Sequence, residues 1–167
     1  MADTVRIRRA AVAEATAITE LVLRSKAMWG YDADFMAKCR EELTVRPSFI
    51  EAGEVWVAEA GGTIVGMVGL WPRVHGDDRS AELHMIFVDP GAVRSGVGRA
   101  LWRHAEARAR ALGAKALALD SDPYAVGFYE RMGMRIVGES PSGSIPGRML
   151  PRMAKSLAEA LPNCAAG

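Results

Sequence analysis

The stretch FVDPGAVRSGVGRAL, residues 87–101, carries the clearest structural signal in the chain. An apolar run ending at Val88 is typical of a strand, and the Pro-Gly pair that follows turns the chain. Gly96 and Gly98 then open an Ala- and Leu-rich segment that predicts a helix as far as Leu112. The first amides of a helix lack intrahelical partners and carry partial positive charge. This junction therefore predicts a site for a phosphate or a pyrophosphate.

Two arginines in the same stretch, Arg94 and Arg99, would add charge for a phosphorylated ligand. The alternative is a tight connection in which the glycines serve geometry alone. The stretch is not a Walker loop, because no Gly-Lys-Ser/Thr follows. It also lacks the third glycine of a dinucleotide-binding fingerprint.

Outward from this junction, strands and helices alternate along the chain. The patterns predict strands over residues 4–8, 54–60, 63–71, 80–88, 115–119, 134–139 and 150–156, and helices over 10–26, 32–42, 96–112 and 123–132. Residues 153–161 fit a helix equally well. This order predicts a single α/β (α+β) domain spanning residues 1–167, with a mixed sheet and helices packed on it.

The strand over residues 80–88 is predicted to alternate between two faces. One face would present Leu83, Met85 and Phe87, and the other Glu82, His84, Ile86 and Val88. Trp71-Pro72 is expected to end the preceding strand, with a solvent-exposed loop from His75 to Arg79.

Composition excludes several classes of protein. Of 167 residues, 50% are hydrophobic and 25% charged, which argues against global disorder. The net charge of +1 provides no overall basic field for nucleic acid. No apolar run reaches the ~20 residues of a membrane span, and no signal peptide precedes the first strand, so we expect a soluble, cytoplasmic protein. Cys39 and Cys164 lack metal-ligand spacing, so neither a zinc site nor a disulfide is expected, and Cys39 is expected to be inert core.

A second motif reads DPYAVGFYERMGM over residues 122–134. With the glycine turn, it resembles the GNAT N-acetyltransferases, whose acyl-CoA loop reads Gln/Arg-x-x-Gly-x-Gly/Ala and whose later element reads Asn-x-x-Ala-x-x-Phe-Tyr-x-x-x-Gly-Phe. The chain departs from these patterns at Val93, Asp122 and Met134. Val93 removes a side-chain contact but leaves the backbone amides of the loop.

The resemblance implies a mixed, mostly antiparallel sheet of six to seven strands flanked by about four helices. It implies acetyl-CoA as co-substrate, no metal, and a homodimer by analogy. The residues implied to bind acetyl-CoA are Ile86, Phe87 and Val88 along the pantetheine arm, Val93, Arg94, Ser95, Gly96, Val97, Gly98 and Arg99 around the pyrophosphate, and Asp122, Phe128 and Tyr129 from the second motif.

The implied reaction is attack of an amine on the thioester. An alkyl amine with a pKa near 10.4 must lose a proton, at a cost of about 4.6 kcal/mol at pH 7. Glu82 is the predicted base and His84 its rival or helper; both would otherwise be solvated or structural residues. Tyr129 is the implied donor to the departing thiolate. A backbone amide near Phe87 or Val88 would stabilise the oxyanion.

The acceptor pocket is predicted near Trp29 and Tyr31, which could equally serve packing. Arg148, in a small-residue loop before the last strand, is a candidate carboxylate binder, although a plain hairpin connection also explains the loop. The sequence thus predicts acetyl transfer to a primary amine of a small molecule or an exposed peptide amine. A non-catalytic acyl-CoA sensor and a nucleotide-phosphate-binding domain are the alternatives.

Overall fold

The computed structural model describes residues 4–158, which form one seven-stranded sheet in the order β1-β2-β3-β4-β5-β7-β6. All neighbouring strands are antiparallel except β4 and β5, which run parallel. The strands are β1 (Arg6–Arg9), β2 (Val55–Ala60), β3 (Thr63–His75), β4 (Asp78–Val88), β5 (Ala116–Asp120), β6 (Arg135–Pro141) and β7 (Met149–Ser156). The predicted fold class is confirmed.

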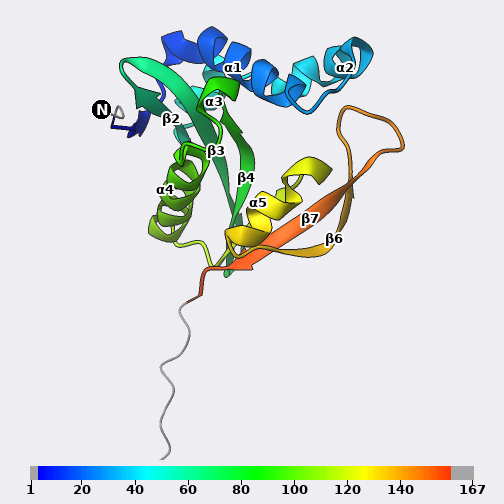
Figure 1. Ribbon diagram of the computed structural model, residues 1–167. Coiled ribbons are helices and arrows are strands. Elements are labelled where there is room, and N and C mark those ends of the chain that lie inside the picture. Colours follow the sequence, from blue (N-terminus) through cyan, green and yellow to red (C-terminus); the bar gives the residue numbers. More distant parts are fainter. Residues whose placement is uncertain (1–3, 159–167) are drawn as a thin grey trace, which may run out of the picture.

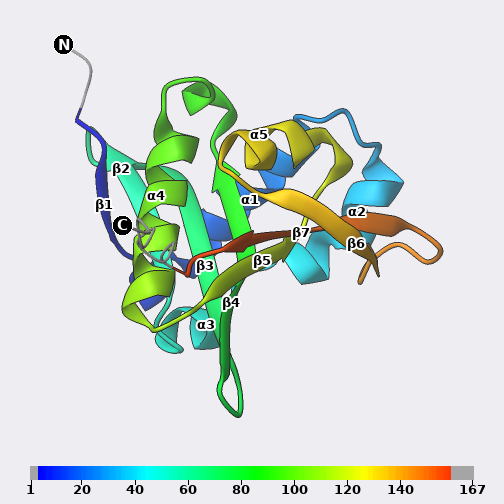
Figure 2. The same cartoon turned by 90° about the horizontal axis from the view of Figure 1, so that it is seen from below.

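Helices cover both faces of the sheet. They are α1 (Ala15–Ala27), α2 (Ala33–Leu43), α3 (Pro47–Glu51), α4 (Val97–Ala111) and α5 (Val126–Arg131), with short 3₁₀ turns at Val12–Glu14, Pro90–Ala92 and Pro123–Ala125. Helices α1, α2 and α3 lie on one face, and α4 and α5 on the other (Figures 1 and 2). No helix within residues 4–158 is long and apolar enough to cross a membrane.

Each face has its own apolar core. On the α4 face, Trp102 and Leu101 pack with Tyr129 of α5 and with Leu117 of β5. On the other face, α1 packs on the sheet through residues that include Ile18.

The alternative prediction of a helix over residues 153–161 is wrong over Met153–Ser156, because these residues form part of a strand that pairs with β5 and β6. Residues 157 and 158 follow that strand, and residues 159–161 lie outside the described residues.

Around the β3–β4 hairpin, the predicted end of the strand is wrong, while the predicted exposure of residues 75–79 is confirmed. Strand β3 does not end at Trp71-Pro72 but continues to His75, which pairs with Asp78 across a two-residue turn. The expected solvent loop is therefore the tip of a long hairpin that projects from the sheet (Figure 2). A strand tolerates Pro72 there because that end of the hairpin is exposed.

Helix α3 was not predicted, although Pro47 stands at its first turn, a position that proline favours. Helix α2 follows the cap residue Asp32, whose carboxylate accepts a hydrogen bond from the Phe35 amide at 2.8 Å.

The predicted alternation of β4 is also wrong in one respect, because the strand contains a β-bulge. Gly69 pairs with Met85 and Leu70 with Leu83, so His84 has no partner on β3. Leu83 therefore packs in the core on the α4 face, whereas Met85 and Phe87 belong to the opposite face. The bulge places His84 beside the ring of Phe49 on the α3 side of the sheet.

Strands β4 and β5 separate soon after they pair. Their parallel pairing covers Ser80 to Glu82 on β4, and no later residue of β4 pairs with β5 within the described chain. The edge of β4 from Leu83 to Val88 is therefore open on the side that faces β5. Figure 1 shows β6 and β7 running away from β4 at this point, with α5 between them.

Candidate active site

A cleft of about 1280 Å³ occupies the opening between β4 and β5. Its walls come from α1, α2, β4, the α4 loop, α5 and the β6–β7 loop. The glycine turn lines one part of the cleft, and Glu82, His84 and Arg148 line another. The sheet therefore brings both predicted motifs to one cavity.

The loop before α4 adopts the backbone geometry of an anion-binding turn. Arg94 has a φ of 61° and Gly96, the N-cap of α4, a φ of 89°, so two left-handed residues flank Ser95. Successive amides around such residues form a concavity for anions. In the described chain, the backbone amides of residues 94–96 donate to no other backbone group, and no side chain caps α4.

Gly98 lies where a side chain would fill the cleft. A Cβ placed there would approach Phe128 of α5 at 3.4 Å and Val88 of β4 at 3.6 Å. The side chain of Val97 instead belongs to the buried core, and Val97 does not line the cleft. A phosphorylated ligand at this turn would meet backbone amides together with Arg94 and Arg99, both of which line the cleft.

Tyr129 lines the cleft from α5 and is only 8% exposed. Its ring packs against Phe128 and Trp102, with centroids 5.3 and 6.0 Å apart. Burial raises the pKa of Tyr129 well above the ordinary value, and the negative charge of Asp122 adds to the effect. The phenol is therefore a neutral hydrogen-bond donor over the whole physiological range.

His84 and Glu82 lie on the same side of β4, but their surroundings differ. Burial of the His84 ring beside Phe49 lowers its pKa, although the charges of Glu42 and Glu82 oppose the shift. The imidazole is therefore neutral at pH 7 and free to accept a proton.

The carboxylate of Glu82 forms an ion pair with the guanidinium of Arg152. Arg152 of β7 donates to both oxygens of Glu82, with Nη2–Oε2 at 2.8 Å, and also to Asp120 at 3.2 Å. These bonds raise the pKa of Arg152. A carboxylate that already accepts a charged hydrogen bond on each oxygen is a weaker direct acceptor for the proton of an amine than a free one.

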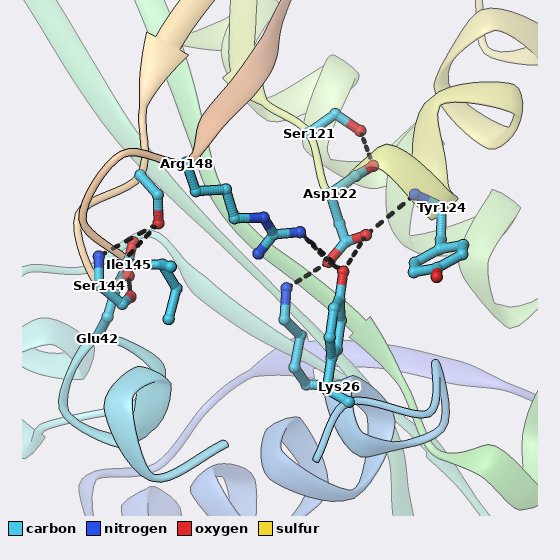
Figure 3. Close-up of polar contacts among 10 residues, drawn as sticks. Lys26, Glu42, Ser121, Asp122, Tyr124, Ser144, Ile145 and Arg148 are labelled. Atoms are coloured by element: carbon cyan, nitrogen blue, oxygen red, sulfur yellow. Dashed lines mark hydrogen bonds and ion pairs between the residues drawn. The ribbon is translucent and has the colours of Figure 1, made fainter. Parts of the chain in front are cut away.

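Asp122 is the centre of a polar cluster (Figure 3). Its carboxylate accepts from Lys26 Nζ at 2.5 Å, from the Tyr31 hydroxyl at 2.8 Å and from the Tyr124 amide at 3.0 Å. Burial opposes ionisation, but the hydrogen bond from Lys26 and the others lower the pKa of Asp122. Burial together with the hydrogen bond to Asp122 raises the pKa of Tyr31 to about 12.

Arg148 closes this cluster from the β6–β7 loop. Its Nη2 donates to the Tyr31 hydroxyl at 2.8 Å and lies 3.8 Å from Asp122. Ser144 of the same loop donates to Glu42 of α2 (Figure 3). The loop joins the antiparallel strands β6 and β7 as a hairpin and also contacts α2 across the cleft.

Residues 19–134 match the Acetyltransferase (GNAT) family. The chain belongs to this family. The match runs from α1 to the end of the second motif and contains the glycine turn, so it confirms the family that the two motifs predicted.

Two curated relatives are acetyltransferases. The peptidyl-lysine N-acetyltransferase YiaC of Escherichia coli (strain K12) is 31% identical over 134 residues, which cover 78% of this GNAT chain and 84% of YiaC. The mycothiol acetyltransferase of Streptomyces bingchenggensis (strain BCW-1) is 36% identical over 103 residues, 54% of this chain but only 32% of that protein.

Solved structures share the GNAT fold. The PaiA N-acetyltransferase of Thermoplasma acidophilum, solved with coenzyme A, has a TM-score of 0.72 at 17% identity and covers 92% of this chain and 99% of its own. YncA of Salmonella typhimurium, a putative acetyltransferase solved with acetyl-CoA, has a TM-score of 0.69 at 22% identity and covers 98% of this chain and 99% of its own.

Most site residues predicted for this GNAT protein line the cleft, Trp29 and Asp122 among them, whereas Tyr31 and Val97 do not. Tyr31 lies behind the wall and reaches the site only through Asp122 and Arg148. The carboxylate of Asp122 faces Lys26 and the acceptor-side residues. Trp29 is 39% exposed and stacks on Tyr124, with ring centroids 5.5 Å apart.

The sequence analysis missed Lys26, Glu42, Ser144 and Arg152. Each lies on an element whose pattern was read for its apolar face or its turn residues, and no motif marks any of them. Their contacts with residues far away in the sequence are what identify them.

Within residues 4–158, no group of three or more His, Cys, Asp or Glu side chains is arranged to hold a metal ion.

Proposed function

We propose that this GNAT protein transfers the acetyl group of acetyl-CoA to a primary amine, either of a small molecule or exposed on a peptide. The proposal rests on one observation above all: a single cleft joins the anion-binding turn at residues 94–99 to Tyr129 and His84. Family membership supports the same reaction class, and the relative YiaC is named as acting on peptidyl-lysine.

The residues present fit acetyl-CoA. The turn would hold the pyrophosphate through its backbone amides and the charges of Arg94 and Arg99. The open edge of β4 from Ile86 to Val88 would pair with the pantetheine amides as an added strand would. When bound, acetyl-CoA supplies the activated acetyl thioester.

His84 is the proposed proton acceptor for the amine. Its neutral imidazole lines the cleft, whereas Arg152 occupies the carboxylate of Glu82. Glu82 then acts through its charge, which favours the imidazolium that forms when His84 takes the proton. Of the two predicted bases, the geometry favours His84.

Backbone amides of β4 would stabilise the charge that develops on the carbonyl oxygen. The strand has no pairing to β5 after Glu82 in the described chain, so this edge would leave main-chain amides free to donate to that oxygen. The oxyanion donor predicted near Phe87 or Val88 would belong to this edge.

Tyr129 would donate a hydrogen bond to the departing sulfur. Its raised pKa makes full proton transfer to a thiolate unfavourable, so the hydroxyl stabilises the leaving group without losing its proton. We expect Tyr129→Phe to lower kcat by about tenfold to a thousandfold with CoA affinity nearly unchanged. Stopped-flow turnover and CoA titration measure the two quantities, and a variant at full rate would exclude this role.

The experiment that tests the function is thiol release from acetyl-CoA across a panel of primary amines, with CoA binding measured separately. Amine-dependent release with one acetylated product per thiol supports the proposal. Tight CoA binding with no release from any amine would instead indicate an acyl-CoA sensor. Competition by ATP as strong as that by CoA would indicate a nucleotide-binding domain.

A further inference from the structure

The polar cluster around Asp122 contains an imbalance of charge. Two cations, Lys26 and Arg148, share the one carboxylate of Asp122, so the cluster carries a formal charge of +1. The Lys26 and Asp122 side chains are each 12% exposed and that of Arg148 is 20% exposed. An excess charge with so little access to water is unfavourable unless an anion approaches it.

Arg148 has hydrogen-bonding capacity to spare. Among residues 4–158, only its Nη2 has a hydrogen-bonding partner, the Tyr31 hydroxyl, so Nε and Nη1 donate to no protein group. The guanidinium lies over the rings of Phe35 and Tyr31, 4.9 and 5.3 Å from their centroids, which fixes its orientation. A planar guanidinium with a free edge is suited to bidentate binding of a carboxylate.

The Tyr31–Phe35 pair supports both cations. Their rings stack with centroids 4.0 Å apart, and Lys26 Nζ lies 5.1 Å from the centre of Tyr31. Both Lys26 and Arg148 line the cleft, while the two aromatic rings do not. The cations are therefore presented to the cavity on a rigid support.

Another part of the same cleft has the opposite charge. The carboxylates of Glu42 and Glu82 act on His84, against a smaller opposing effect of Arg73. Arg152 pairs with Glu82, whereas within the described chain Glu42 has no cationic side chain within ion-pair distance. An ammonium group is favoured beside the carboxylate of Glu42, where His84 would accept its proton. The acceptor region thus has a negative end at His84 and a positive end at Arg148.

We propose that the acceptor is an amino acid-like molecule, an amine that also carries a carboxylate, and that Arg148 with Lys26 binds this carboxylate. The inference rests on the proposed acetyl transfer and specifies its substrate class. Asp122 and Tyr31 act as positioning residues: they hold the two cations and leave the free edge of Arg148 toward the cleft.

The test compares amines that differ only in this carboxylate. Glycine, 4-aminobutanoate and 6-aminohexanoate are each assayed beside their carboxamides, with acetyl-CoA saturating. We expect kcat/KM for the carboxylate to exceed that for the carboxamide at least tenfold for one or more chain lengths. We expect Arg148→Gln to bring this ratio close to one and Arg148→Lys to restore part of it. Ser144→Ala, which loosens the same loop without removing a charge, should keep the ratio of the wild type.

Thermal stabilisation of the CoA-saturated protein provides a readout that does not need turnover. The carboxylates should raise the melting temperature more than the carboxamides, and Arg148→Gln should abolish the difference while the protein still binds CoA. If carboxylates stabilise the protein but no amine is acetylated, the proposed function fails and the acceptor assignment fails with it, while the carboxylate site at Arg148 stands. If carboxamides react and stabilise as well as carboxylates at every chain length, the inference is wrong even though acetyl transfer is real.

Discussion

Asp122 illustrates how one substituted residue changes a site. The resemblance to GNAT proteins leads to an expectation of Asn at this position, and the chain has a carboxylate instead. Lys26 on α1 and Arg148 on the β6–β7 loop explain the change, because both are cations that an amide could not neutralise. The substitution and its partners belong to three distant parts of the chain.

We expect Asp122→Asn to destabilise the protein by about 3 kcal/mol, because it leaves Lys26 partly buried without a counter-charge. Urea unfolding at pH 7 measures the effect. The double variant Lys26→Met with Asp122→Asn should lose less stability than the sum of the two single variants, since it removes both members of the pair. Additive losses would show that the pair is not coupled.

The pH profile separates the two candidate bases. Because burial lowers the pKa of His84, the imidazole is the neutral, active form at pH 7 and becomes protonated only below its ordinary value of about 6.5. We therefore expect kcat/KM to fall on an acidic limb below that pH, with His84→Gln losing this limb and at least tenfold in rate.

Glu82→Gln is the matched control, since it removes the neighbouring carboxylate and keeps the imidazole. It should retain the limb, shifted to lower pH because the charge that favours the imidazolium is gone. If Glu82→Gln abolishes the limb while His84→Gln keeps it, the base is Glu82.

At the scale of elements, the junction of β4 with α4 decides where a ligand can bind. The left-handed turn at Arg94 and Gly96 directs the loop, and Gly98 leaves room between α4 and α5. Neither feature would suffice alone, because the amides need both the helix start and close approach of the ligand.

We expect Gly98→Val to weaken CoA binding at least tenfold, because its methyl groups would meet Phe128 and occupy the cleft. Isothermal titration with CoA measures the loss. Gly138→Ala on β6 is the control, since a Cβ there meets nothing within 4 Å and the residue lies outside the cleft. Unaltered affinity in Gly98→Val would place the pyrophosphate elsewhere.

At the scale of the whole molecule, ionisable groups on both faces of the sheet favour the same pH range. The ion pair with Arg24 lowers the pKa of Asp89, and the hydrogen bond from Arg8 lowers that of Glu14. Burial lowers the pKa of His104, whose Nε2 is buried without a hydrogen bond while its ring lies 4.3 Å from that of Trp56. Each group is therefore harder to protonate in the folded state than in the unfolded chain.

Depressed pKa values of both kinds act in the same direction. The stability they contribute is present above the unfolded-state values, about 6.5 for His and about 4 for Asp and Glu, and is lost as the pH falls. We expect the free energy of unfolding to fall modestly between pH 7.5 and 5.5 and steeply below pH 4.5, as measured by urea denaturation. His104→Gln should flatten the first part, and greater stability at pH 5.5 than at pH 7.5 would contradict the prediction.

The sequence alone determined the local features of this protein. Pro and Gly turns, apolar periodicity and the two motifs predicted the strand–turn–helix junction, most element boundaries and the GNAT family, because each depends on residues close together in the chain. The short α3 and the extension of β3 escaped this reading, since a five-residue helix and an exposed strand end leave little periodicity.

Only the tertiary structure decided the chemistry of the cleft. The bulge that turns His84 toward Phe49, the guanidinium that occupies Glu82, and the cluster of Lys26, Asp122 and Arg148 all join residues far apart in sequence. The residue type in the sequence is the same whether a charged side chain is solvated, paired with another charge or positioned to bind a substrate. Its role depends on which partner the packing of helices on the sheet places within about 3 Å, where hydrogen bonds and ion pairs form.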